Sequence, residues 1–177
     1  MSNSRIAAPE PDEYAPYYQR YLDLLPEGDV LEILDKQMHL LLDLLLGLTD
    51  DEADFRYAEG KWSIKEVIGH MIDTERVFAF RALSFARGET AALPGYDENI
   101  YVDNADFAQR TRGSLSGEYE GLRKSNLFLY PSFGADVQLR RGIADGKEMS
   151  VRAIPWIMAG HERHHFSVLN ERYLPHL

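Results

Sequence analysis

Four long segments of this sequence repeat apolar residues every three or four positions, which is the spacing of a helix that buries one face. They are residues 29–48, 63–88, 105–130 and 150–174. No segment has the alternating pattern of a strand, so the four predicted helices must bury their apolar faces against one another. The connection between the second and third helices is long enough to cross such an assembly. We therefore predict an all-α fold, a four-helix bundle with a long crossover connection.

Residues near the helix starts support these boundaries. Asp29 followed by Glu32, and Ser63 followed by Glu66, match the capping box that begins a helix. Pro155 lies early in the last helix, where we expect it to disturb the first turns.

The composition divides the chain into two parts. Residues 1–28 are a proline- and tyrosine-rich N-terminal extension, and its piece YAPYYQRYLDLL is expected to form a short helix on the main body. Residues 29–177 are expected to form one bundle domain, because a chain of 177 residues with 45 % hydrophobic content can bury a full apolar core.

Charge and composition exclude several classes of partner. The formal net charge of −10 argues against nucleic acid, since phosphate backbones bind clustered Lys and Arg. The longest apolar run, Leu40 to Leu48, is interrupted by Asp43 and is far shorter than the roughly 20 residues that cross a bilayer. The sequence has no cysteine, and its first residues do not resemble a signal peptide. We expect a cytoplasmic protein with no membrane partner.

Two histidines on the last predicted helix are candidates for metal ligands. His161 and His165 are four positions apart, which places them about 40° apart around the helix axis and roughly 6 Å apart along it. They fall on the same stripe as Ile157, Met158 and Val168, so their rings should point into the bundle. Buried imidazoles need partners for both nitrogens, although the spacing alone also fits a polar pair without metal.

A third histidine on another helix favours a metal site. His70 follows Val67 by almost one turn on the second predicted helix, among core residues. A single histidine in such a place is usually structural, but His70, His161 and His165 together match three neutral ligands that leave positions open for water or substrate. We expect one divalent ion, with zinc and nickel both suited to imidazole.

Two further residues of the last helix are candidates for catalysis. His164 lies one position from the ligand face, and Glu162 is a candidate for moving a proton. The letters HERHH also fit the H-E-x-x-H pattern of zinc proteases, in which the Glu is the general base. That interpretation is weak, because Val168 and Glu171 stand where the metzincin extension needs Gly and His.

Three stretches of the sequence resemble the DinB-like superfamily, in its branch near the bacillithiol transferases and metal-dependent hydrolases. They are WSIKEVIGHMIDTERVFAFRAL, LPGYDEN and SVRAIPWIMAGHERHHFSVLNERYL. The resemblance extends from about Asp29 onward and implies a four-helix bundle with a crossover and a three-histidine metal site at His70, His161 and His165. It also implies a homodimer, and some members transfer low-molecular-weight thiols to electrophiles.

We therefore expect an enzyme that transfers a low-molecular-weight thiol, as cosubstrate, to a small electrophile at the metal site. The alternatives are a metal-dependent hydrolase and a non-catalytic metal-binding bundle. Tyr96, Asp97 and Tyr101 are expected to line the entrance for the small-molecule substrate.

Overall fold

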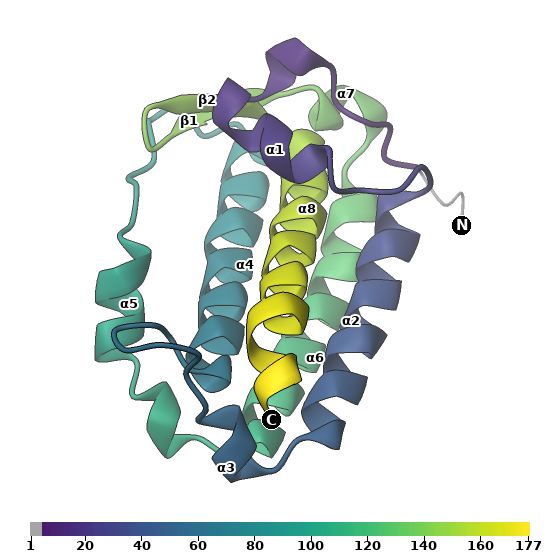
Figure 1. Ribbon diagram of the computed structural model, residues 1–177. Helices are drawn as coiled ribbons and strands as arrows, with labels where there is room; N and C mark the ends of the chain where they lie inside the picture. Colours follow the sequence, from purple (N-terminus) through teal and green to yellow (C-terminus); the bar gives the residue numbers. More distant parts are fainter. Residues whose placement is uncertain (1–4) are drawn as a thin grey trace.

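The computed structural model describes residues 5–177 as a four-helix bundle with shorter elements at both ends and along one side (Figure 1), which confirms the predicted fold class. The bundle helices are α2 (Val30–Gly47), α4 (Ile64–Ala86), α6 (Arg112–Leu129) and α8 (Ala153–Val168). The shorter helices are α1 (Gln19–Leu22), α3 (Asp50–Ala53), α5 (Glu98–Asn104) and α7 (Ala135–Gln138). Two strands, β1 (Arg141–Ala144) and β2 (Lys147–Ser150), form a hairpin, and a π-helical turn (Leu169–Tyr173) extends α8.

The order of the helices is not a simple up-and-down arrangement. Helix α2 packs against α6 and α8, and α4 packs against the same two helices, so α2 and α4 occupy opposite corners of the bundle. In Figure 1, α2 and α8 run in one direction while α4 and α6 run in the other. Residues 87–111, which include α5, return along the outside of the bundle before α6 begins. This segment is the predicted crossover.

The predicted helix starts are partly confirmed. Ser63 and Glu66 form a reciprocal capping box, with 3.2 Å from the Glu66 amide nitrogen to Ser63 Oγ and 2.6 Å from the Ser63 amide nitrogen to Glu66 Oε2. Asp29 caps α2 by accepting from the Leu31 amide at 2.8 Å, but Glu32 does not complete a box, because its exposed carboxylate lies beside Lys36 instead.

Two expectations about the helices were wrong. Helix α6 begins at Arg112 and not near Ala105, because Thr111 Oγ1 accepts from the Ser114 amide and caps the helix there. Pro155 is the third residue of α8, within the first turn, where a missing amide hydrogen removes no intrahelical hydrogen bond. It therefore leaves the helix intact.

The expectation that the chain has no strands was also wrong. Strands β1 and β2 pair antiparallel with Ala144 opposite Lys147, which leaves Asp145 and Gly146 as a two-residue turn. Both turn residues have positive φ, 54° and 67°. Two-residue hairpin turns favour Asp-Gly for this conformation, so the signal was present in the sequence.

The N-terminal extension lies on the bundle, as expected, and its aromatic residues enter the core. Tyr14, Tyr18 and Tyr21 are buried in the cluster that also contains the first turns of α8. Glu13 accepts hydrogen bonds from Ser150 and Arg152. Helix α1 is thereby held along α8, close to the predicted histidines.

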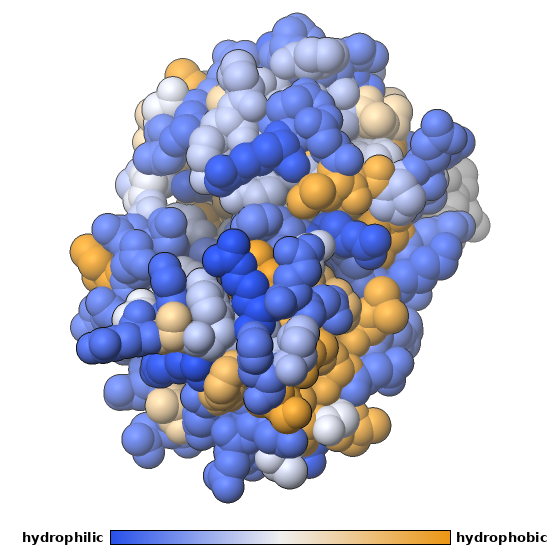
Figure 2. All heavy atoms as spheres, in the orientation of Figure 1, coloured by the Kyte–Doolittle hydropathy of each residue, from blue (hydrophilic) through white to orange (hydrophobic). Residues whose placement is uncertain are grey.

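The surface is mixed. The face in Figure 2 is largely hydrophilic, with apolar side chains gathered over the lower part of α2, and Leu40 and Leu46 on α2 are 48 % and 76 % exposed. Within residues 5–177, no helix combines the length and the apolar character needed to cross a membrane.

Candidate metal centre

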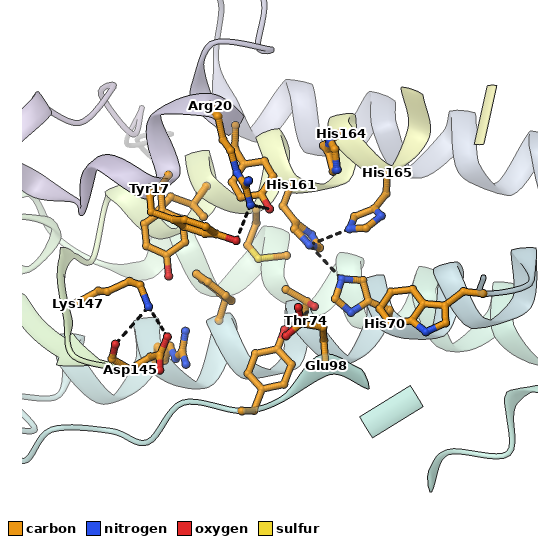
Figure 3. Close-up of a pocket in the computed structure, with 18 residues that line it drawn as sticks. Tyr17, Arg20, His70, Thr74, Glu98, Asp145, Lys147, His161, His164 and His165 are labelled. Carbon is orange, nitrogen blue, oxygen red and sulfur yellow. Dashed lines mark hydrogen bonds and ion pairs between the residues drawn. The ribbon is translucent and has the colours of Figure 1, made fainter. Parts of the chain in front are cut away.

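The three predicted histidine ligands meet between two helices. His70 projects from α4, while His161 and His165 project from successive turns of α8 (Figure 3). The Nε2 atom of His161 lies 3.2 Å from that of His70 and 3.1 Å from that of His165. One nitrogen from each ring falls within 4.8 Å of the other two. The structure thus brings together the residues that the sequence pattern grouped.

Burial keeps these rings neutral. It lowers the pKa of His70 to about 4 and that of His165 to about 3, and it holds the pKa of His161 well below its usual range. The neighbouring imidazoles lower the pKa of His161 and His165 further. Above pH 5 each ring therefore has an unprotonated nitrogen, which is the form that binds metal.

The donor set fits one divalent ion. Ligand nitrogens about 2.0–2.1 Å from a common centre are separated by roughly 2.9–3.4 Å in octahedral or tetrahedral geometry. The two measured nitrogen separations, 3.2 and 3.1 Å, lie inside this interval. Three imidazoles leave one or more coordination positions open, and the cluster contains no carboxylate that would fill them.

Aromatic rings hold the ligands in position. The Trp62 ring packs 5.0 Å from the His70 ring, and the Tyr21 ring packs edge-on at 5.5 Å from the His161 ring. Gly160 permits the second contact, because a Cβ atom at this position would lie 2.3 Å from the carbonyl oxygen of Tyr21. The N-terminal extension thus forms part of the site's wall.

The histidines open into a cavity of about 450 Å³. Its wall combines aromatic side chains with charged ones, namely Tyr17, Tyr18, Tyr21, Trp62, Phe78, Tyr96, Arg20, Arg81, Lys147, Glu98 and Asp145. In Figure 3 the Lys147–Asp145 pair lies at the opposite end of this cavity from His70 and His165. A small molecule can therefore reach the histidines while touching groups from α4, α8, the hairpin and the N-terminal extension.

The structure separates the two candidate catalytic residues. His164 is exposed, lines the cavity and packs against the Tyr21 and His165 rings, and partial desolvation lowers its pKa. Glu162 is not brought to the histidines. Its carboxylate accepts a hydrogen bond from Tyr119 at 2.6 Å and pairs with Arg123 in the bundle core.

Glu162 belongs to a buried ionic cluster. Arg123, 1 % exposed, donates to both oxygens of Glu75 at 2.8 Å and also pairs with Glu162. Asn126 donates to Glu75 at 3.0 Å, so the shared guanidinium and one amide satisfy two buried carboxylates. Glu75 on α4 and Glu162 on α8 thus both face α6 across the core.

Of the three predicted entrance residues, one lines the cavity. Tyr96 does so, and its hydroxyl lies 2.7 Å from Thr74 Oγ1. The carboxylate of Asp97 instead accepts from the amides of Asn99 and Ile100 and caps α5. Tyr101 packs on Tyr96 and lines a neighbouring depression outside the main cavity.

Sequence reasoning missed the cationic residues of the cavity. Arg20 lies in the extension, whose role was unassigned, and Lys147 lies in the unpredicted hairpin. Arg81 could have been found, because it follows His70 by 11 positions and so shares its helix face.

Comparisons with known proteins agree with this architecture. A model of the DinB superfamily matches residues 33–169. Among solved structures, YfiT from Bacillus subtilis has a similar fold, with a TM-score of 0.69 and 17 % sequence identity over 97 % of this chain and 95 % of that chain. It is described as a probable metal-dependent hydrolase with an unusual four-helix bundle topology. No curated protein matches the sequence.

Proposed function

Because the chain belongs to the DinB superfamily, we propose that it is an enzyme that uses one divalent ion, held by His70, His161 and His165, to act on a small molecule in the adjoining cavity. The observation that carries this proposal is the convergence of three neutral imidazole nitrogens at one end of a cavity of about 450 Å³. Zinc and nickel both suit such a donor set. A non-catalytic role is less favoured, since a structural ion is normally enclosed by four protein ligands.

We propose thiol transfer as the reaction. When bound, the ion supplies Lewis acidity, which deprotonates a coordinated thiol outright and lowers the pKa of a coordinated water. Among the described residues, no carboxylate belongs to the three-histidine cluster, and Glu162 is engaged by Arg123 and Tyr119. Such a site suits a thiol, which needs less help to lose its proton than water does.

In this reaction the cosubstrate and the side chains of the cavity have separate roles. A low-molecular-weight thiol, supplied as cosubstrate because the chain has no cysteine, forms the new bond from its sulfur to the electrophilic atom. The leaving group departs with the bonding pair. His164, an exposed residue at the cavity wall, carries the thiol proton toward solvent. Tyr21 and Trp62 hold the ligand rings and keep water from their buried faces.

Hydrolysis is the second candidate, because the similar structure of YfiT is described as that of a probable metal-dependent hydrolase. In that case a water takes the place of the thiol, and His164 is the group available to accept its proton.

Elemental analysis tests the metal site. We expect about one zinc or nickel per chain after reconstitution, and loss of the ion in His70→Ala and His161→Ala. His39→Ala is the matched control, because His39 is an exposed histidine on α2 beside Asp35. A metal-free wild type, or full occupancy in the ligand variants, would contradict the proposal.

A conjugation screen tests the reaction. The metal-loaded protein is offered bacillithiol, mycothiol, glutathione or cysteine with a chromogenic electrophile, beside ester and amide substrates without thiol. Turnover that requires metal and one thiol, and that is lost in His165→Ala, supports transfer. Turnover of an ester or amide without thiol favours hydrolysis.

A further inference from the structure

The cavity as a whole carries an excess of positive charge. Arg20, Arg81 and Lys147 line the cavity together with the carboxylates of Glu98 and Asp145, which leaves one net positive charge beside neutral histidines. The whole chain, by contrast, has a formal net charge of −10. A positive cavity in an acidic protein attracts anions locally while the rest of the surface repels them.

Arg81 is the buried member of these positively charged residues. Its side chain belongs to a residue only 3 % exposed, yet it lines the cavity. Its guanidinium lies 4.8 Å from the Phe78 ring and donates a long hydrogen bond, 3.3 Å, to the carbonyl oxygen of Pro94. Across residues 5–177, no carboxylate oxygen lies within 4.0 Å of it. A buried arginine that uses one of five donors is costly unless a ligand supplies acceptors.

Within the described chain, no carboxylate of the cavity forms an ion pair with Arg81. Asp145 accepts from Lys147, its partner across the hairpin turn, and so is already paired. Glu98 is exposed at the start of α5, where solvent screens its charge. Arg20 stacks on Tyr17 and Tyr21 and donates to the Tyr21 hydroxyl at 2.8 Å, with no carboxylate partner in the described chain.

Arg81 and the histidines lie along one face of α4. His70, Thr74, Phe78 and Arg81 all line the cavity, and the 11 positions from His70 to Arg81 correspond to about 16 Å along the axis and a net rotation of about 20°. A molecule that lies along this face can touch both ends at once.

We propose that the cavity binds an anionic group of the substrate, a carboxylate or a phosphate, on the guanidinium of Arg81, so that the reacting part of an elongated molecule lies at the three histidines. Lys147 adds positive charge at the end away from the histidines, and Arg20 adds it beside Tyr21, nearer to them (Figure 3). Neither residue is required for the contact. This inference deepens the proposed function and rests on it for the position of the reacting atoms, but the anion site itself is independent of metal.

Isothermal titration of the full-length protein with short amphiphiles tests the proposal. Hexanoate and hexyl phosphate are the anionic probes, and hexan-1-ol is the neutral probe of the same length. All three are titrated in EDTA, so that an ion at the histidines cannot hold the anion. We expect wild-type protein to bind at least one anion more tightly than the alcohol, and the tighter anion identifies the preferred group.

Variants of Arg81 then assign the contact. Arg81→Gln should weaken binding of the preferred anion by about tenfold or more and leave the alcohol unchanged, because a buried charge-assisted contact is lost. Arg81→Lys should retain part of the affinity. Arg87→Gln is the matched control, because Arg87 is an exposed arginine that follows the last residue of the same helix and does not line the cavity.

Two results would overturn the inference. The first is equal binding of all three probes by the wild type, which overturns the inference even if the Arg81 variants fail to fold. The second is anion binding that Arg81→Gln leaves unchanged. A third titration, with metal restored in place of EDTA, can also overturn it: anion binding that appears only there and that Arg81→Gln leaves unchanged rejects the Arg81 contact and leaves the metal site standing. A protein that takes up no metal on reconstitution, yet binds anions through Arg81, contradicts the proposed function and supports the inference.

Discussion

The neutral state of the three histidines predicts a strong dependence of stability on pH in the metal-free protein. An unfolded histidine has a pKa of about 6.5, whereas burial lowers the pKa of His70 to about 4 and that of His165 to about 3 in the folded chain, with that of His161 also well below its usual range. Below about pH 6.5 these histidines therefore bind protons in the unfolded chain but remain neutral in the folded chain. The stabilisation is complete above pH 6.5 and is lost as the pH falls toward the folded pKa values.

The size of the loss follows from these values. At pH 5.5 the unfolded form gains about 1.4 kcal/mol for each histidine that stays neutral in the fold, or about 4 kcal/mol for three. That is a large fraction of the stability of an ordinary domain.

Urea unfolding in EDTA at pH 8 and pH 5.5 measures the effect. His70→Gln and His165→Gln should each reduce the loss on acidification by about 1.4 kcal/mol, because glutamine does not titrate. His39→Gln, at an exposed position, should leave the loss unchanged. Comparison between variants cancels the other groups that titrate in this interval. If all four proteins lose the same free energy of unfolding, the histidines are not held neutral, and the argument for free ligand nitrogens fails.

Three further predictions concern the bundle and its assembly. Arg123→Met should lower the free energy of unfolding at pH 7 by about 3–5 kcal/mol, because two buried carboxylates lose their cation. Arg76→Met breaks an exposed ion pair and should lower it by only about 0–1 kcal/mol. Equal losses in the two variants would contradict this dependence on burial. Gly160→Ala should destabilise the fold by about 1–3 kcal/mol, because the added methyl group pushes α1 away from α8. Gly117→Ala, which has open space around it, should stabilise α6 by up to about 1 kcal/mol. In thermal melting, the first variant should have a lower Tm than the wild type and the second a higher one. Light scattering should give a dimer, twice 20.3 kDa, with the exposed apolar residues of α2 as its interface, and the mass of one chain would refute this.

Local patterns were enough to predict the four bundle helices and to single out the candidate ligand residues. The Ser63–Glu66 capping box could be predicted because its hydrogen bonds join residues three positions apart. His161 and His165 could be predicted to lie on one face because the geometry of a single helix fixes their separation. The Asp145–Gly146 turn was equally local, and it was overlooked because the residues beside it lack an alternating pattern.

Other features depended on which helix faces meet. His70 joins the other ligands only because α4 packs on α8. Glu162 is one position from His161, yet the same packing turns it toward Arg123 on α6 and away from the cavity. The extension and the hairpin, distant in sequence, bring Arg20 and Lys147 to the wall of the cavity that Arg81 lines. A helix specifies the angle between its own side chains, but the neighbour that each side chain meets is set by the packing of the whole bundle, to which residues far apart in the chain contribute.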